Sequence, residues 1–175
     1  MELFLTFKFI IQNMNLTEVF EAQKKLDLAF ANSIEKTEFL NIKIKMVIAL
    51  LVELGEFANE VKLFKYWKKD KSINQISMLE EYADGIHFIT SIALKNNITS
   101  FDIKPIIKYN DFTLQLAYTY QCFTKLFLHH NKRLIKKAYG VYLGLGEIMN
   151  IDRDMICTAY AKKNHKNHER IKNNY

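Results

Sequence analysis

Two pairs of acidic residues occur at a spacing that places each pair on one face of a helix. Glu53 and Glu56 are three residues apart, as are Glu81 and Asp84, and residues three apart are neighbours on a helix surface. If the two helices lie side by side and antiparallel, the four carboxylates repel one another unless a cation neutralises them. Oxygen ligands suit Mg²⁺, with Mn²⁺ as a substitute ion, and Mg²⁺ usually shares its shell with waters and phosphates. The pattern therefore predicts a metal site for phosphate chemistry.

The first acidic pair continues a face that begins apolar. At 100° per residue, one stripe contains Ile42, Met46, Ala49, Glu53, Glu56 and Glu60. A solvated acidic face is the alternative interpretation of either pair taken alone. Two such pairs, both flanked by apolar residues, favour a shared pocket.

The elements that must position these acids are helices. The strongest helical period in the chain runs through Leu40, Ile44, Val47, Leu51 and Leu54. This period predicts a helix from about Glu38 to Leu63, followed by a loop at Trp67–Asn74.

Capping signals and apolar periods predict the remaining helices. The expected ranges are about 15–31, opened by Asn15; 77–95, opened by Ser77; 110–129, opened by Asn110 or Asp111; 132–149; and a last helix that begins after Asp152 and fades into the basic tail. Five glycines and one proline are too few for an all-β fold. We therefore expect one all-α domain over residues 1–175, a bundle of five to six helices.

Composition and charge narrow the class of protein. Hydrophobic residues make up 49% of the chain, which argues against intrinsic disorder. Two cysteines exclude a disulfide-stapled scaffold. We expect no secretory signal in Met1–Ile11 and no membrane span, since Met46–Val52 is far too short, and hence a cytoplasmic location. Much of the net charge of +6 lies in residues 160–175, a segment suited to an anionic partner.

Several segments resemble one family. They are ELGEFANE at 53–60, FKYWK at 64–68, EEYADGIHF at 80–88, QKKLD at 23–27 and YAKKNHKNHER at 160–170. Together they resemble the dimeric dUTP pyrophosphatases (dUTPases) of the all-α nucleoside triphosphate pyrophosphatase superfamily. The resemblance spans about Gln23 to Tyr175.

The resemblance implies a homodimer that hydrolyses dUTP to dUMP and pyrophosphate with Mg²⁺ and so limits uracil incorporation into DNA. It also admits dUDP as a substrate. Glu53, Glu56, Glu81 and Asp84 match the family's metal ligands, and Glu53 is our choice for the group that activates the attacking water.

The resemblance also implies substrate contacts. Base and sugar contacts are expected from Gln23, Asp27, Trp67, His87 and Phe88. His87 is a candidate donor to a uracil carbonyl oxygen, with a structural histidine as the alternative. Phe88 is a candidate to pack on the deoxyribose, although a position in the core is the stronger alternative.

Phosphate contacts are expected from the basic segments. The residues are Lys65, Lys68, Lys163, Asn167 and Arg170. The tail departs from the family pattern: Ile171 follows the arginine where the family often has Gln, and Asn174 precedes the last tyrosine where the family often has Gly.

Three alternatives remain open from the sequence. A related all-α pyrophosphatase with another nucleotide preference would keep the same metal residues. A di-iron carboxylate bundle typically needs two ExxH motifs, and this chain has one related spacing, Asp84 to His87. A non-enzymatic helical protein that binds nucleic acid or a regulator is compatible with the pI of about 9.1. The acidic pocket argues against direct nucleic-acid binding, whereas a regulatory protein partner is not readable from the sequence.

Overall fold

The computed structural model describes residues 14–98 and 102–173. Met1–Ile11 and Asn174, for which the sequence raised expectations, lie outside these ranges. Six α-helices occupy the described residues: α1 (Thr17–Ser33), α2 (Ile42–Val61), α3 (Gln75–Lys95), α4 (Phe112–Thr124), α5 (Lys132–Ile148) and α6 (Arg153–Lys172). The short strands β1 (Met14–Asn15) and β2 (Asp102–Ile103) pair antiparallel. The all-α prediction is confirmed, and no helix in the described ranges is long and apolar enough to cross a membrane.

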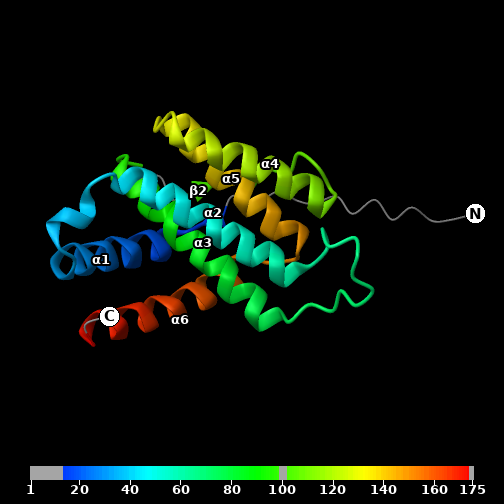
Figure 1. The fold of residues 1–175 in the computed structure, drawn as a ribbon, viewed down its shortest axis with the longest axis horizontal. Helices are drawn as coiled ribbons and strands as arrows, with labels where there is room; N and C mark the ends of the chain where they lie inside the picture. The colour runs from blue at the N-terminus through cyan, green and yellow to red at the C-terminus, as the bar shows by residue number, and fades with distance from the viewer. Residues whose placement is uncertain (1–13, 99–101, 174–175) are drawn as a thin grey trace, which may run out of the picture.

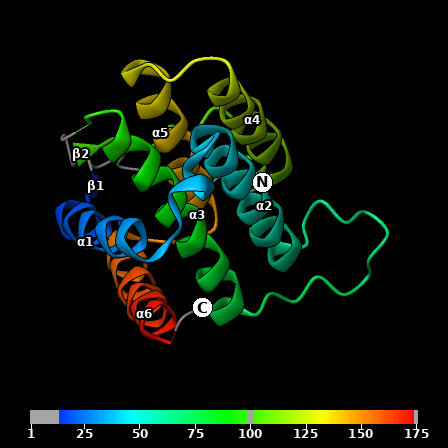
Figure 2. The same cartoon turned by 60° about the vertical axis from the view of Figure 1, so that its left-hand side comes forward.

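Helix α3 is the centre of the arrangement. It packs against α1, α2, α5 and α6, while α4 packs on α2 and α5 (Figure 1). Helices α2 and α3 run antiparallel, joined by the long connection 62–74, which extends away from the bundle (Figure 2). Because α3 is covered on several sides, most of its side chains from Tyr82 to Ala93 are buried. A polar group on this helix therefore points into the molecule.

Two tyrosines lock α3 to α5. The Tyr82 hydroxyl donates to the Tyr142 carbonyl at 3.1 Å, and the Tyr142 hydroxyl donates to the Tyr82 carbonyl at 3.0 Å. Their rings stack with centroids 4.6 Å apart. This close approach requires a glycine at position 85, since a Cβ there would lie 2.2 Å from the Tyr142 hydroxyl oxygen. The clamp fixes α3 directly beside Asp84.

Helix α2 starts later than its apolar period predicted. Asn41 has the left-handed φ of 58°, which separates the 3₁₀ turn Lys36–Phe39 from the helix. The predicted stripe is correct at Val47 and Leu54, which are fully buried. It is wrong at Leu40 and Ile44, which are exposed. The buried face instead contains Met46, Val47, Leu50, Leu54, Phe57, Ala58 and Val61.

Two predicted helix starts differ from the observed ones. Helix α3 begins at Gln75 rather than after Ser77, because the Asn74 side chain accepts from the backbone N–H groups of Ile76 and Ser77 at 3.0 and 3.2 Å. In α1 the Asn15 side chain accepts from the Thr17 N–H at 3.1 Å, but Leu16 occupies the capping position.

The other predicted boundaries have mixed outcomes. Asp111 and Asp152 cap α4 and α6 as predicted, each accepting a backbone N–H three residues on. Helix α4 ends at Thr124, earlier than predicted, and continues as the 3₁₀ turn Lys125–Phe127. The expected fading of the last helix is wrong, because α6 runs to Lys172 and packs along α1 and α3. The loop predicted at Trp67–Asn74 contains no helix.

Candidate active site

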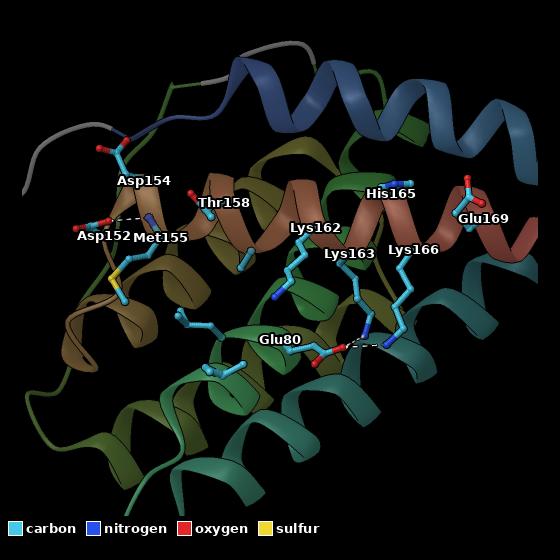
Figure 3. A pocket seen from close by; sticks show the side chains of 13 residues that line it. Glu80, Asp152, Asp154, Met155, Thr158, Lys162, Lys163, His165, Lys166 and Glu169 are labelled. Carbon is cyan, nitrogen blue, oxygen red and sulfur yellow. Dashed lines mark hydrogen bonds and ion pairs between the residues drawn. The ribbon is translucent and has the colours of Figure 1, made fainter.

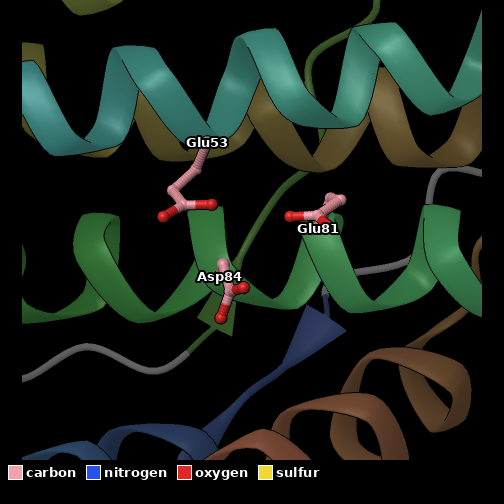
Figure 4. A group of neighbouring side chains, drawn as sticks. All are labelled: Glu53, Glu81 and Asp84. Carbon is pink, nitrogen blue, oxygen red and sulfur yellow. The ribbon is translucent and has the colours of Figure 1, made fainter.

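Helices α2 and α3 turn three carboxylates toward one point. Glu53 comes from α2, and Glu81 and Asp84 come from α3 (Figure 4). One oxygen from each lies within 4.8 Å of the others. Glu56, the fourth acid of the predicted set, is exposed and stands outside this triplet. Its charge still acts on the neighbouring acids, because it contributes to raising the pKa of Glu53 and of Glu81.

Crowding and burial make the triplet hard to ionise. Burial raises the pKa of Glu53 to about 7, and the charges of Asp84, Glu56 and Glu81 add to the shift. Burial likewise raises the pKa of Glu81 to about 7, helped by Glu56 and Asp84. Near neutral pH, protons therefore partly occupy a site that a cation could fill.

The triplet fits a hard divalent cation. Its donors are all carboxylate oxygens, the ligands preferred by Mg²⁺ and Mn²⁺. Glu53 Oε2 is buried and has no hydrogen-bond partner among residues 14–98 and 102–173. A buried acceptor without a partner is costly, and a cation would satisfy it.

A lysine from α6 enters the acid cluster. Lys163 Nζ lies 2.5 Å from Asp84 Oδ2 and 3.3 Å from Glu80 Oε1. Burial opposes the charged lysine, but Asp84 and Glu80 outweigh it, so the pKa of Lys163 is raised. Lys166 also contacts Glu80 Oε1, at 3.2 Å (Figure 3). Sequence reasoning missed Glu80, although its position one turn before Asp84 places both acids on the same face of α3.

A chain of polar side chains connects α1, α3 and α6 beside the acids. Gln23 Nε2 donates to Asp27 Oδ1 at 2.8 Å, and the Ser91 hydroxyl donates to the Asp27 carboxylate at 2.7–2.8 Å. The Tyr160 hydroxyl donates to Gln23 Oε1 at 2.8 Å, and His87 Nδ1 lies 2.8 Å from the same oxygen. Gln23 thus uses both ends of its amide inside the protein.

This network assigns the tautomer of His87. Asp27 can only accept, so the Gln23 amino group faces it and the amide oxygen faces His87. His87 Nδ1 must then carry the proton, which leaves Nε2 as an acceptor. Burial and Lys163 lower the pKa of His87 to about 3, so the ring is neutral. His87 Nε2 is buried and has no partner in the described part of the chain. In this tautomer Nε2 would accept a hydrogen bond, so the predicted donation from His87 to a uracil carbonyl would need the other tautomer.

Two acids of the triplet, Glu53 and Asp84, line a cavity of about 380 Å³ together with most of the polar network. Among the predicted site residues, its lining includes Gln23, Asp27, Glu53, Asp84, His87, Phe88, Lys163, Asn167 and Arg170. Four helices, α1, α2, α3 and α6, supply these side chains. Residues expected to meet metal, base, sugar and phosphate thus face a common space.

Among the described residues, five predicted ones do not line this cavity: Glu56 and Glu81 of the acidic pairs, and Lys65, Trp67 and Lys68. Lys65, Trp67 and Lys68 lie on the connection 62–74 and are absent from the cavity lining of the described chain. Trp67 is 61% exposed and packs edge-on against Phe64 and Tyr66. The side chain of Lys65 donates to Asn59. Composition alone did not indicate that this connection extends away from the bundle.

Two further residues escaped the sequence analysis. Ser91 lies one turn beyond His87 on the face that Asp84 also occupies, so extending that stripe would have found it. Tyr160 lies within the resembling tail segment, where the sequence suggested phosphate contacts. Its ring instead stacks on His87, with centroids 4.1 Å apart.

The chain belongs to a class of helical enzymes that hydrolyse nucleoside triphosphates to a monophosphate and pyrophosphate. Within that class, the family model described as dUTPase matches residues 15–175, so the chain belongs to the dUTPase family. Its function is that of a dUTP diphosphatase, with dUTP as a small-molecule substrate, and the family is metal-dependent in general. No curated protein matches the chain.

Proposed function

We propose that the chain hydrolyses dUTP with Mg²⁺, or Mn²⁺ in its place, held by Glu53, Glu81 and Asp84. The observation that carries this proposal is the approach of three carboxylate oxygens within 4.8 Å, together with the unpartnered Glu53 Oε2. When bound, the cation would offset phosphate charge and make a coordinated water more acidic. Glu56 is exposed but interacts with Glu81 through its side chain, and it stays the proposed fourth ligand at the edge of the triplet.

Glu53 is the proposed proton acceptor for the attacking water. Its carboxylate belongs to the triplet that would hold the cation, so it would lie close to a water bound to that ion. Its partly buried position in α2 limits its motion. These two properties support the role that the family resemblance implied.

Phosphate binding is assigned to α6. Lys163, Asn167 and Arg170 line the cavity that Glu53 and Asp84 also line. An ammonium and a forked guanidinium make strong charge-assisted bonds to phosphate oxygens. We place the triphosphate between this helix and the acids. Lys65 and Lys68 do not line this cavity in the described part of the chain, so we do not assign them phosphate contacts within a single chain.

Base selection is assigned to His87. An acceptor at Nε2 matches the N3–H donor of uracil, whereas the N3 of cytosine is itself an acceptor and would be repelled. Gln23 and Tyr160 hold the imidazole in this tautomer, and Ser91 holds Asp27 at the end of the network. Phe88 provides apolar surface at the same cavity, suited to the sugar.

A homodimer is proposed through the outer face of α2. Leu40 precedes the helix and is 69% exposed; Ile44, Ile48 and Val52 follow at intervals of four and are 47–50% exposed. An apolar row of this length on a helix surface is typical of an interface. Ile48→Glu should give monomers in sedimentation analysis. Ile76→Glu, at an exposed isoleucine on α3, is the matched control and should leave the assembly unchanged.

The decisive assay measures pyrophosphate release from dUTP, dCTP, dTTP and UTP, with and without Mg²⁺. We expect release from dUTP that requires the metal and disappears in Glu53→Gln. Equal rates for all four nucleotides would reject the base assignment and leave the metal assignment standing. Turnover of dUTP that is indifferent to chelation would reject the metal assignment.

A further inference from the structure

Lys163 forms an ion pair with Asp84, one of the three acids of the proposed metal site. Its ammonium lies 2.5 Å from Asp84 Oδ2, and the two side chains are only 12% and 13% exposed. A close ion pair shielded from water is strong. A divalent cation that coordinates Asp84 would face this ammonium at short range, where like charges repel. The contact seen here and full coordination by Asp84 therefore compete.

The structure provides a second position for the Lys163 side chain, toward Glu80 and a larger cavity. The same side chain also lines a larger cavity of about 850 Å³ between the start of α3 and α6 (Figure 3). Glu80 lines that cavity too and lies 3.3 Å from Lys163 Nζ. Lys166 Nζ lies 3.2 Å from the same Glu80 oxygen, so this carboxylate already pairs with two ammonium groups. The ammonium can leave Asp84 without losing a carboxylate partner.

We propose that Lys163 is an exchangeable counter-ion of the metal site. Without a bound cation it pairs with both Asp84 and Glu80; when the divalent cation binds, it leaves Asp84, keeps Glu80 and turns toward the substrate phosphates. Metal loading thereby couples to the position of one α6 side chain that contacts substrate. This inference rests on the proposed metal site.

The first test measures Mg²⁺ binding to nucleotide-free protein by calorimetric titration. Lys163→Met removes the competitor and should tighten Mg²⁺ binding about tenfold, the size expected for loss of a shielded ion-pair contact. Lys166→Met is the matched control, because it removes the same charge from the same Glu80 oxygen but does not touch Asp84. Its affinity should stay within about twofold of the parent protein.

The outcomes separate this inference from the proposed function. Equal affinities in all three proteins, or equal tightening in both variants, would overturn the exchange while the metal site stands. Absence of Mg²⁺ binding in every protein would remove the metal site and the exchange with it.

A second test uses the unaltered protein and so does not depend on the folding of a variant. Lysine acetylation by a small reagent, followed by mass spectrometry, reports the access of each ammonium. Saturating Mg²⁺ alone should speed acetylation of Lys163 several-fold and leave Lys166 unchanged. A Lys163 rate that is unchanged or slower with Mg²⁺ would contradict release.

Discussion

Replacing Glu53 by glutamine should stabilise the metal-free protein while it abolishes hydrolysis. Glu53 has a pKa of about 7 in the folded protein, against an ordinary value of 4.5. Because the folded state holds this proton more tightly than the unfolded chain, the contribution of Glu53 to stability is fully present below pH 4.5 and is lost as the pH rises through about 7. A glutamine side chain at this position would carry no charge and avoid this loss.

The size of the gain follows from the same two values. Ionising Glu53 in the folded state costs at most about 3 kcal/mol relative to the unfolded chain. The side chain is only partly buried, so solvent screening reduces this to about 1–2 kcal/mol. In a chain of this size, that corresponds to a rise in Tm of about 2–8 °C.

The assay compares thermal unfolding of the parent protein and Glu53→Gln in chelator at pH 8 and at pH 4.5. The gain should appear at pH 8 and largely vanish at pH 4.5. Glu60→Gln, two helical turns further along α2 and outside the triplet, controls for the loss of one acidic residue. A Glu53→Gln protein that is no more stable than the parent at pH 8 would refute the reasoning that crowded carboxylates strain this site.

Three further predictions concern metal, base and core. Mg²⁺ should raise the Tm of the parent protein more at pH 8 than at pH 6, because protons at Glu53 compete with the ion below its pKa of about 7; equal shifts would argue against that competition. His87→Asn should reduce the ratio of kcat/KM for dUTP over dCTP by about tenfold or more, since the acceptor is displaced; an unchanged ratio would place base selection elsewhere. Gly85→Ala should cost about 1–3 kcal/mol in urea unfolding, because its Cβ would meet the Tyr142 hydroxyl. Gly55→Ala is the control, with its nearest contact at 3.3 Å, and a cost as large as that of Gly85→Ala would contradict the clamp.

The acidic pairs show how far spacing can lead. Helical period placed Glu81 and Asp84 on one face of α3, and both join the triplet because α3 is enclosed by neighbouring helices. On α2 the same spacing placed Glu53, but not Glu56, in the triplet of neighbouring carboxylates. Helix α2 has an exposed side, and Glu56 is turned far enough toward it to be exposed. A period of 3.6 residues reports which residues are neighbours, but it does not report how much of the helix surface is covered.

The sequence by itself determined the helical class, most helix positions, the two acidic pairs and the family resemblance, because these depend on residues close together in the chain. Only the tertiary structure decided how distant segments meet. The Tyr160 hydroxyl donates to Gln23 across 137 residues, at the same amide oxygen that His87 Nδ1 contacts. The tertiary structure also places Lys163 in contact with Asp84 and Trp67 outside the cavity lining. These contacts depend on the packing of helices against one another, which local propensity and periodicity do not encode.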